Sequence, residues 1–311
     1  MPAPDAYPAD TAASNVSRAD APRTSLSPRL RGAVARRLGL PDLLPLDLSG
    51  LRALYAAWCR NVPFDNVRKL IALRTGDEGP LPGGDATDFL EHWLAHGTGG
   101  TCWSSSNALF ELVASYGFDA RRVAGSMRDL GIPGHGSVKV HIDGADWLVD
   151  SSMLIMHPIP LPSSTHVDRD PLFGVEVEFT EGTHLVWFDT PPYDEYFPCR
   201  LLIDPVDHAF YLERYEISRT RGPFNHHLSV RYNRNGERAV LQGHTRHRRT
   251  RDGQQSDDLE PDQLCRVLRD DVGMSAEMVQ RWADCGALEA AYEPSMNPPA
   301  PLTGRPPSRR S

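Results

Sequence analysis

Residues Gly97-Thr98-Gly99-Gly100-Thr101-Cys102-Trp103 mark the point at which the sequence changes character. The glycines end one helical pattern, and a new one begins just after Cys102. Glycine lets the backbone turn and approach other groups closely, and a helix N-terminus lowers the pKa of a thiol through its dipole and free N–H groups. This position favours Cys102 as a reactive thiolate, and a buried structural thiol is the alternative.

Helical periodicity dominates around this glycine turn. One helix is predicted after Asp47, where Asp47 or Ser49 can cap it, a second over 87–95, and a third from Cys102 to a stop at Gly117. Their apolar residues recur at helical spacing: Leu51, Leu54, Tyr55 and Trp58; Phe89, Leu90, Trp93 and Leu94; Leu109, Leu112, Val113 and Tyr116.

After Gly117 the apolar spacing changes to a period of two, which is typical of strands. Strands are predicted around 123–127, 138–142, 147–150, 175–179, 184–188, 228–232 and 239–241, and a last helix follows Pro261 and stops at Gly273. Helices, then antiparallel strands, then a small strand-plus-helix unit predict an α+β fold rather than a doubly wound sheet.

Composition excludes several classes of function. The 311-residue chain is 40% hydrophobic, enough for a sizeable core, and its 41 acidic against 33 basic residues argue against a nucleic-acid or membrane-surface binder. No run reaches the about 18 apolar residues of a spanning helix. Residues 1–30 lack the apolar core of a secretion signal, so we predict a cytoplasmic protein.

Five widely spaced cysteines without a CxxC pair predict reduced thiols rather than a disulfide framework or a zinc ribbon. Residues 1–27 and 290–311 contain few large apolar side chains and are predicted to be disordered tails. A metal site is a weaker hypothesis, because no Cys or carboxylate stands in ligand register, and we predict none. Its ligands would be His226, His227, His244 and His247.

A nucleophilic cysteine needs an imidazole to take its proton and a third group to orient that imidazole. A hairpin that pairs Ile142 with Trp147 gathers His135, His141 and Asp150 on one face. The other face then holds the apolar residues Val138, Val140, Ile142, Trp147 and Val149. In this register His141 lies nearer to Asp150 than His135 does, but the register does not choose between them, and both remain candidates for the base. The alternative for His141 is a surface histidine, and the alternative for His135 is a histidine in a turn.

Four motifs together resemble the arylamine N-acetyltransferase family. They are Val62-Pro63-Phe64-Asp65-Asn66, Gly99-Gly100-Thr101-Cys102, His135 with Trp147-Leu148-Val149-Asp150, and Phe224-Asn225 before a strand pair. The family pattern is Pro-Phe-Glu-Asn, Arg-Gly-Gly-x-Cys and a His–Asp pair at this spacing, and the resemblance covers roughly residues 30–285. It assigns Cys102 as the nucleophile, His135 as the base and Asp150 as the group that orients the imidazole.

The resemblance implies a helical bundle over 28–117 that carries the nucleophile, an antiparallel β-barrel over 118–218 that carries the His and Asp, and an α/β lid over 219–289. It implies ping-pong transfer of an acyl group from a thioester to a small-molecule amine, with no permanently bound cofactor and no nucleic-acid or membrane partner. The donor is acetyl-CoA or an acyl group on a carrier protein. We expect substrate contacts from Phe64, Gly100, Thr101, Trp103, Ser151 and Phe224.

The chain departs from the family pattern at several positions. Thr98 stands where the family has Arg, Ser104 where it commonly has Glu, and Asp65 where it has Glu. Residues 151–154, Ser-Ser-Met-Leu, replace a Val-Gly-Phe-Gly stretch whose glycines let substrate and coenzyme approach the backbone. The altered pocket keeps a carrier-bound acyl donor open beside acetyl-CoA.

Two other classes of function compete with acyl transfer. A transglutaminase-like or cysteine amide hydrolase would use the same Cys–His–Asp set on amides, and a non-catalytic binding protein would keep only the fold. The complete set of Cys102, His135 and Asp150 favours an enzyme.

Overall fold

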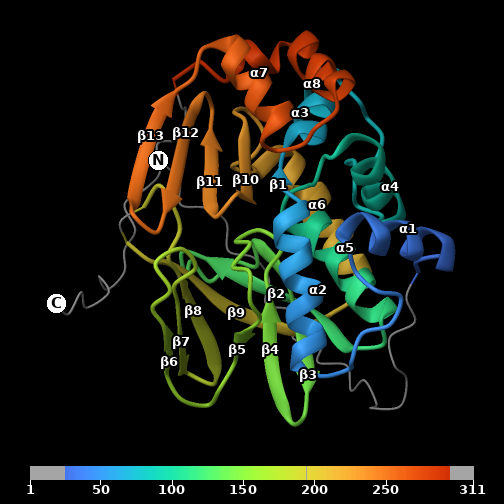
Figure 1. Ribbon diagram of the computed structural model, residues 1–311, viewed down its shortest axis with the longest axis vertical. Helices are drawn as coiled ribbons and strands as arrows, with labels where there is room; N and C mark the ends of the chain where they lie inside the picture. The colour runs from blue at the N-terminus through green and yellow to red at the C-terminus, as the bar shows by residue number, and fades with distance from the viewer. Residues whose placement is uncertain (1–24, 194, 295–311) are drawn as a thin grey trace, which may run out of the picture.

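The computed structural model describes residues 25–193 and 195–294. The chain begins with a helical region, whose central helix α2 runs along the middle of the molecule (Figure 1). Ser27, Asp47 and Asp85 accept hydrogen bonds from first-turn N–H groups and so fix where three of these helices begin. The helices are α1 (Pro28–Leu38), α2 (Leu48–Asn61), α3 (Val67–Arg74), α4 (Ala86–His96) and α5 (Cys102–Ser115).

Eight antiparallel strands form a sheet that curves into a nearly closed barrel (Figure 1). The strand order is β5-β4-β3-β2-β9-β8-β7-β6. Val138, Val140 and Ile142 pack with the apolar faces of the helices in one core, which confirms the predicted apolar face of the hairpin. The strands are β2 (Asp119–Met127), β3 (His135–Ile142), β4 (Ala145–Val149), β5 (Ile159–Pro160), β6 (His166–Asp168), β7 (Val175–Thr180), β8 (Thr183–Phe188) and β9 (Phe197–Val206).

A second sheet, of order β1-β10-β11-β12-β13, is built mainly from the C-terminal part of the chain. Its first strand, β1 (Phe64–Asp65), comes from the helical region and pairs antiparallel with β10 (Ser229–Arg234). Between the two sheets, α6 (His208–Arg221) packs against α5. The remaining elements are β11 (Glu237–Gln242), β12 (Thr245–Thr250), β13 (Gly253–Asp258), α7 (Pro261–Asp270), α8 (Ala276–Trp282), the π-helical turn Ala283–Ala287 and α9 (Leu288–Ala290).

The β3–β4 hairpin closes more tightly than predicted. Asp143 and Gly144, at φ 51° and 79°, form a two-residue turn, and Ile142 pairs with Ala145 instead of Trp147. The predicted register was therefore wrong by two residues. A shift of two keeps every side chain on its predicted face, but it changes which residue of β3 lies beside Asp150.

The α+β class is confirmed, with helices before and after an antiparallel barrel. Most of the two predicted tails lies outside the described residues; of the positions that are described, Leu26 is buried and Ser27 caps α1. Within residues 25–193 and 195–294, no helix is long and apolar enough to cross a membrane.

Candidate active site

Cys102 is the first residue of α5. The first hydrogen bond of this helix runs from Ser105 N to Thr101 O at 2.9 Å. The N–H groups of Cys102, Trp103 and Ser104 therefore have no acceptor within the helix and point out of its positive end. The side chain of Cys102 is 7% exposed, so its sulfur sits at this end in a largely desolvated position.

His135 and Asp150 form a buried pair beside this sulfur. His135 Nε2 lies 2.6 Å from Asp150 Oδ2, and the carboxylate also accepts hydrogen bonds from the Ser137 hydroxyl and from the N–H groups of Ser152 and Met153. Nδ1 of the ring is left for the thiol.

The charges of this pair stabilise each other. Burial lowers the pKa of His135, but the charge and hydrogen bond of Asp150, together with a hydrogen bond to Cys102, outweigh burial and raise the pKa above its ordinary value. Burial raises the pKa of Asp150, but the charge and hydrogen bond of His135 and the Ser137 hydroxyl lower it below its ordinary value. These contacts favour a positively charged His135 imidazole held by an ionised Asp150 carboxylate beside the Cys102 sulfur.

His141, the other candidate base, lies in a different environment. Its Nδ1 is 2.7 Å from Asp146, and the two side chains are 37% and 33% exposed. Lys139 joins the same surface group through Asp146 and Asp204. The structure therefore brings His135, and not His141, to Cys102 and Asp150.

Three of the other cysteines are less suited to attack. Burial raises the pKa of Cys59 to about 12 and that of Cys199 well above its ordinary value. Burial also raises the pKa of Cys265. A thiol held protonated is a poor nucleophile, so these three cysteines are weak candidates for attack.

The glycine turn before Cys102 is fastened to β1. Asp65 accepts a hydrogen bond from Gly99 N at 2.5 Å, and Asp65 N donates to Gly100 O at 3.2 Å. A Cβ on Gly99 would lie 1.8 Å from the Pro63 carbonyl oxygen, so only glycine fits there. Burial raises the pKa of Asp65 to about 6, although its two backbone hydrogen bonds, from Gly99 and Val67, lower it.

A family model described as N-acetyltransferase matches residues 47–280. The chain belongs to the arylamine N-acetyltransferase family. The matched range holds all three residues assigned as nucleophile, base and orienting acid. By sequence, no curated protein gives a significant match.

Solved members of the family share the fold. The Mycobacterium marinum arylamine N-acetyltransferase in complex with CoA is 19% identical, with a TM-score of 0.70, and the match covers 84% of this chain and 97% of that one. The Salmonella typhimurium enzyme is 18% identical (TM-score 0.68; 82% and 98% covered), and arylamine N-acetyltransferase C of Bacillus anthracis is 19% identical (TM-score 0.66; 80% and 100% covered).

Two departures from the family pattern remove charge from the nucleophile's surroundings. Thr98 and Ser104 are buried, where the family pattern has Arg and Glu. The Ser104 hydroxyl donates to Thr101 O at 3.1 Å, whereas Thr98 Oγ1 is buried without a partner among the described residues. Both the Arg and the Glu of the family pattern are replaced here, so no buried charge remains at these two positions without its partner.

Residues 151–154, which replace the family's Val-Gly-Phe-Gly, are all buried. The Ser151 hydroxyl is 2.8 Å from that of Ser106, which donates to Gly136 O. Leu154 has a left-handed φ of 50°, a conformation that favours glycine. Side chains therefore fill this part of the fold.

The predicted substrate contacts occupy two places. Phe64 and Trp103 pack with Cys102 in one cluster, and the Phe224 ring meets the Phe64 ring edge-on at 5.2 Å. Gly100 and Thr101 complete the turn that carries the sulfur, since Gly100 bridges to Phe64 and Thr101 precedes the helix. Ser151 is buried as well, but it lies outside this cluster, with its hydroxyl beside that of Ser106.

Two residues near the pair were missed by sequence reasoning. Ser137 lies on the same face of β3 as His135, so its alternation with His135 could have found it. The Tyr55 hydroxyl accepts from Asp150 N and donates to Asp150 O at 2.8 Å. Tyr55 counted only as part of an apolar helix face, and no local pattern could have placed its hydroxyl.

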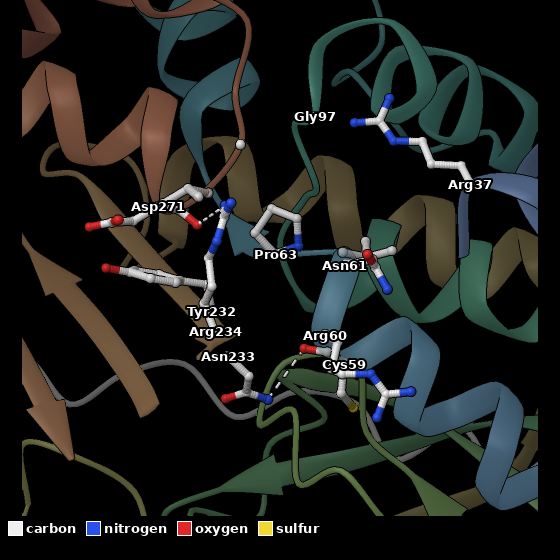
Figure 2. Close-up of a pocket in the computed structure, with 13 residues that line it drawn as sticks. Arg37, Cys59, Arg60, Asn61, Pro63, Gly97, Tyr232, Asn233, Arg234 and Asp271 are labelled. Carbon is white, nitrogen blue, oxygen red and sulfur yellow. Dashed lines mark hydrogen bonds between the residues drawn. The ribbon is translucent and has the colours of Figure 1, made fainter. Parts of the chain in front are cut away.

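A pocket of about 310 Å³ lies elsewhere, between the helical region and the C-terminal sheet (Figure 2). Arg37, Pro63, Arg234 and Asp271 are among its lining residues, and none of the predicted site residues is. Pro63 precedes Phe64 in an extended segment, so the two side chains point to opposite faces. The pocket shares no lining residue with the cluster that packs around Cys102.

The hypothetical histidine metal site is contradicted within the described residues. His244 stacks on the ring of Tyr292 and contacts Ala291 O, and His247 contacts the Ser256 hydroxyl. Over residues 25–193 and 195–294, no three His, Cys, Asp or Glu side chains gather as a metal site would require.

Proposed function

We propose that the protein is an N-acyltransferase that moves an acyl group from a thioester to an amine through an acyl-enzyme on Cys102. The observation that carries this proposal is the placement of Cys102 at the start of α5 beside His135, whose far nitrogen is 2.6 Å from Asp150. Membership of the N-acetyltransferase family supports the reaction class.

In the first half-reaction, the Cys102 thiolate attacks the carbonyl carbon of the thioester, and its proton resides on His135. The N–H groups at the start of α5, which have no acceptor within the helix, donate to the oxyanion in this proposal. When the intermediate collapses, the bond to the donor sulfur breaks, and the departing thiolate takes the proton from His135.

In the second half-reaction, an amine attacks the acyl-enzyme carbonyl and His135 accepts the amine proton. Collapse releases the amide and restores the Cys102 thiolate. Asp150 holds the imidazole in the required tautomer and stabilises its positive form in both halves.

Acetyl-CoA is the proposed donor, and its support comes from the family and from the CoA complex of the Mycobacterium marinum relative. Residues 151–154 carry side chains where the family pattern has glycines that let the coenzyme approach. For this reason an acyl group on a carrier protein is the alternative donor. A reducing compartment such as the cytoplasm suits a free thiol nucleophile.

Intact mass spectrometry after incubation with acetyl-CoA and with longer acyl thioesters tests the proposal. We expect one acyl adduct on the wild type, none on Cys102→Ala, and an undiminished adduct on Cys265→Ala. Loss of the adduct on adding an amine, with formation of the amide, would complete the cycle.

Two results would favour the rival functions. Cleavage of amides with no acylation by any thioester would favour a cysteine amide hydrolase. A wild type without adduct, whose Cys102 reacts with iodoacetamide no faster than free cysteine, would favour a binding protein.

A further inference from the structure

Arg231 lies on the same face of the C-terminal sheet as Phe64, whose ring packs beside Cys102. It is the direct antiparallel partner of Phe64 in the β1–β10 pair, so both side chains point to one face. The Arg231 guanidinium carbon is 5.0 Å from the centre of the Phe64 ring. Phe64 in turn packs with Cys102 and Trp103.

The Arg231 guanidinium forms no ion pair within residues 25–193 and 195–294. No carboxylate there forms an ion pair with it, and its Nε is buried without a hydrogen-bond partner. Two neighbouring arginines differ: Arg238 donates to the carbonyl oxygens of Leu172 and Met153, and Arg249 pairs with Asp189.

A partly desolvated cation that forms no ion pair costs free energy, and a bound anion would reduce that cost. Burial lowers the pKa of Arg231, yet guanidinium remains charged at neutral pH. Its field reaches the reacting groups, since Arg231 interacts electrostatically with Cys102 and Asp150. Arg231 and Phe224 are half-buried, whereas Phe64 and Cys102 are buried, so Arg231 is more accessible than the sulfur.

We propose that Arg231 binds a carboxylate of the substrate that enters over Phe64, which makes the substrate class a carboxylate-bearing one. This inference rests on the proposed acyl transfer at Cys102. A planar guanidinium binds a carboxylate through two parallel hydrogen bonds, and the Phe64 and Phe224 rings hold an apolar or aromatic body beside it. The carboxylate can belong to the amine, as in an aminobenzoate, or to the acyl group, as in a dicarboxylic mono-thioester.

Matched substrate pairs separate these two sources. For the amine, 4-aminobenzoate is compared with its neutral methyl ester, with acetyl-CoA as donor. For the acyl group, succinyl-CoA is compared with butyryl-CoA. Each comparison yields a ratio of kcat/KM for the charged over the neutral substrate, so a general loss of activity cancels.

In Arg231→Met, the ratio for one pair should fall by about 10- to 100-fold, the usual effect of losing a charge-assisted bidentate contact. Arg231→Lys should retain part of the ratio, because lysine keeps the positive charge but cannot form two parallel hydrogen bonds to a carboxylate. Arg234→Met is the control, because Arg234 lies on the same strand, lines the separate pocket and should leave both ratios unchanged (Figure 2). Ratios in Arg231→Met within about threefold of the wild type for both pairs would overturn the inference.

A binding measurement makes the inference independent of the chemistry. Calorimetry on Cys102→Ala should detect binding of 4-aminobenzoate or of succinyl-CoA that is weakened at least tenfold by adding Arg231→Met. If the wild type forms no acyl adduct but this difference persists, the proposed reaction fails and the carboxylate site stands. If the adduct forms but neither ligand distinguishes the variants, the carboxylate site is refuted.

Discussion

Replacing Asp150 with asparagine removes the charge behind His135 while preserving shape. The new side chain is expected to keep the two backbone hydrogen bonds that Asp150 accepts from Ser152 N at 2.9 Å and Met153 N at 2.8 Å. Its amide nitrogen, however, is a donor and faces His135 Nε2, so the imidazole proton moves to Nδ1. That nitrogen must be free to accept the Cys102 proton, so the variant holds the wrong tautomer.

The magnitude follows from the geometry of the pair. With Nε2 2.6 Å from Oδ2, the charge centres are about 4 Å apart, and at an effective dielectric constant of about 20 they attract by about 4 kcal/mol. An imidazolium that exists in the transition state loses this stabilisation in Asp150→Asn, which corresponds to about three orders of magnitude in rate. We expect the acylation of Cys102, followed by release of CoA thiol, to slow by that amount.

The surface pair of His141 and Asp146 provides the control. Asp146→Asn breaks a contact of similar length, 2.7 Å, between side chains that are a third exposed, so acylation should stay within about twofold of the wild type. Thermal unfolding should show both variants folded. Acylation by Asp150→Asn within about tenfold of the wild type, in a folded protein, would refute the reasoning.

Three further results are expected. Gly99→Ala forces its Cβ into the Pro63 carbonyl and should destabilise the fold by about 1–3 kcal/mol or more in denaturant unfolding. Gly32→Ala is the control: its Cβ would make only an ordinary contact with the Arg36 side chain, so it should be neutral or stabilising. His135→Asn should slow iodoacetamide labelling at neutral pH to the rate of a free thiol or below. Folding raises the pKa of His135, so the contribution of His135 to stability is complete below its unfolded-state pKa of about 6.5 and is lost as the pH rises through its folded-state pKa. Folding lowers the pKa of Asp150, so the contribution of Asp150 is present above its unfolded-state pKa of about 4 and is lost as the pH falls through its folded-state pKa. Unfolding titrations on wild type and His135→Asn check both signs, and an alkaline loss that is equal in the two proteins would contradict the first.

Local patterns predicted the helix starts and the strand faces well. Asp47 caps α2 as predicted, and the helix after Pro261 begins at that residue. These features depend on neighbours within a few residues, which the sequence contains in full. The apolar face of the β3–β4 hairpin was predicted correctly for the same reason.

The hairpin register needed information on turn geometry. An Asp-Gly pair at positive φ permits a two-residue turn, and applying this rule strictly at Asp143 and Gly144 would have paired Ile142 with Ala145. In that register His135 is nearer to Asp150 than His141 is. The choice between the two histidines was therefore within reach of the sequence, while the family resemblance supplied it.

Other elements gave weak signals. Helix α6 buries only Tyr211 and Tyr215 among its described residues, so it has no broad apolar stripe. Strand β9 contains Pro198 and Pro205, which argue against a strand in a sequence. The pairing of Phe64 with Arg231 joins segments far apart in the chain, and no local pattern carries it.

The short strand β1 links the cysteine turn to the far end of the chain. Its backbone meets Gly100 on one side and β10 on the other, so the loop that presents the sulfur is linked through β1 to residues from the C-terminal third. Chimaeras that exchange this third between relatives would therefore replace β10, the partner strand of Phe64, together with Arg231, which lies over the Phe64 ring. Such exchanges should carry substrate preference with the C-terminal piece, although every residue of the Cys–His–Asp set stays behind.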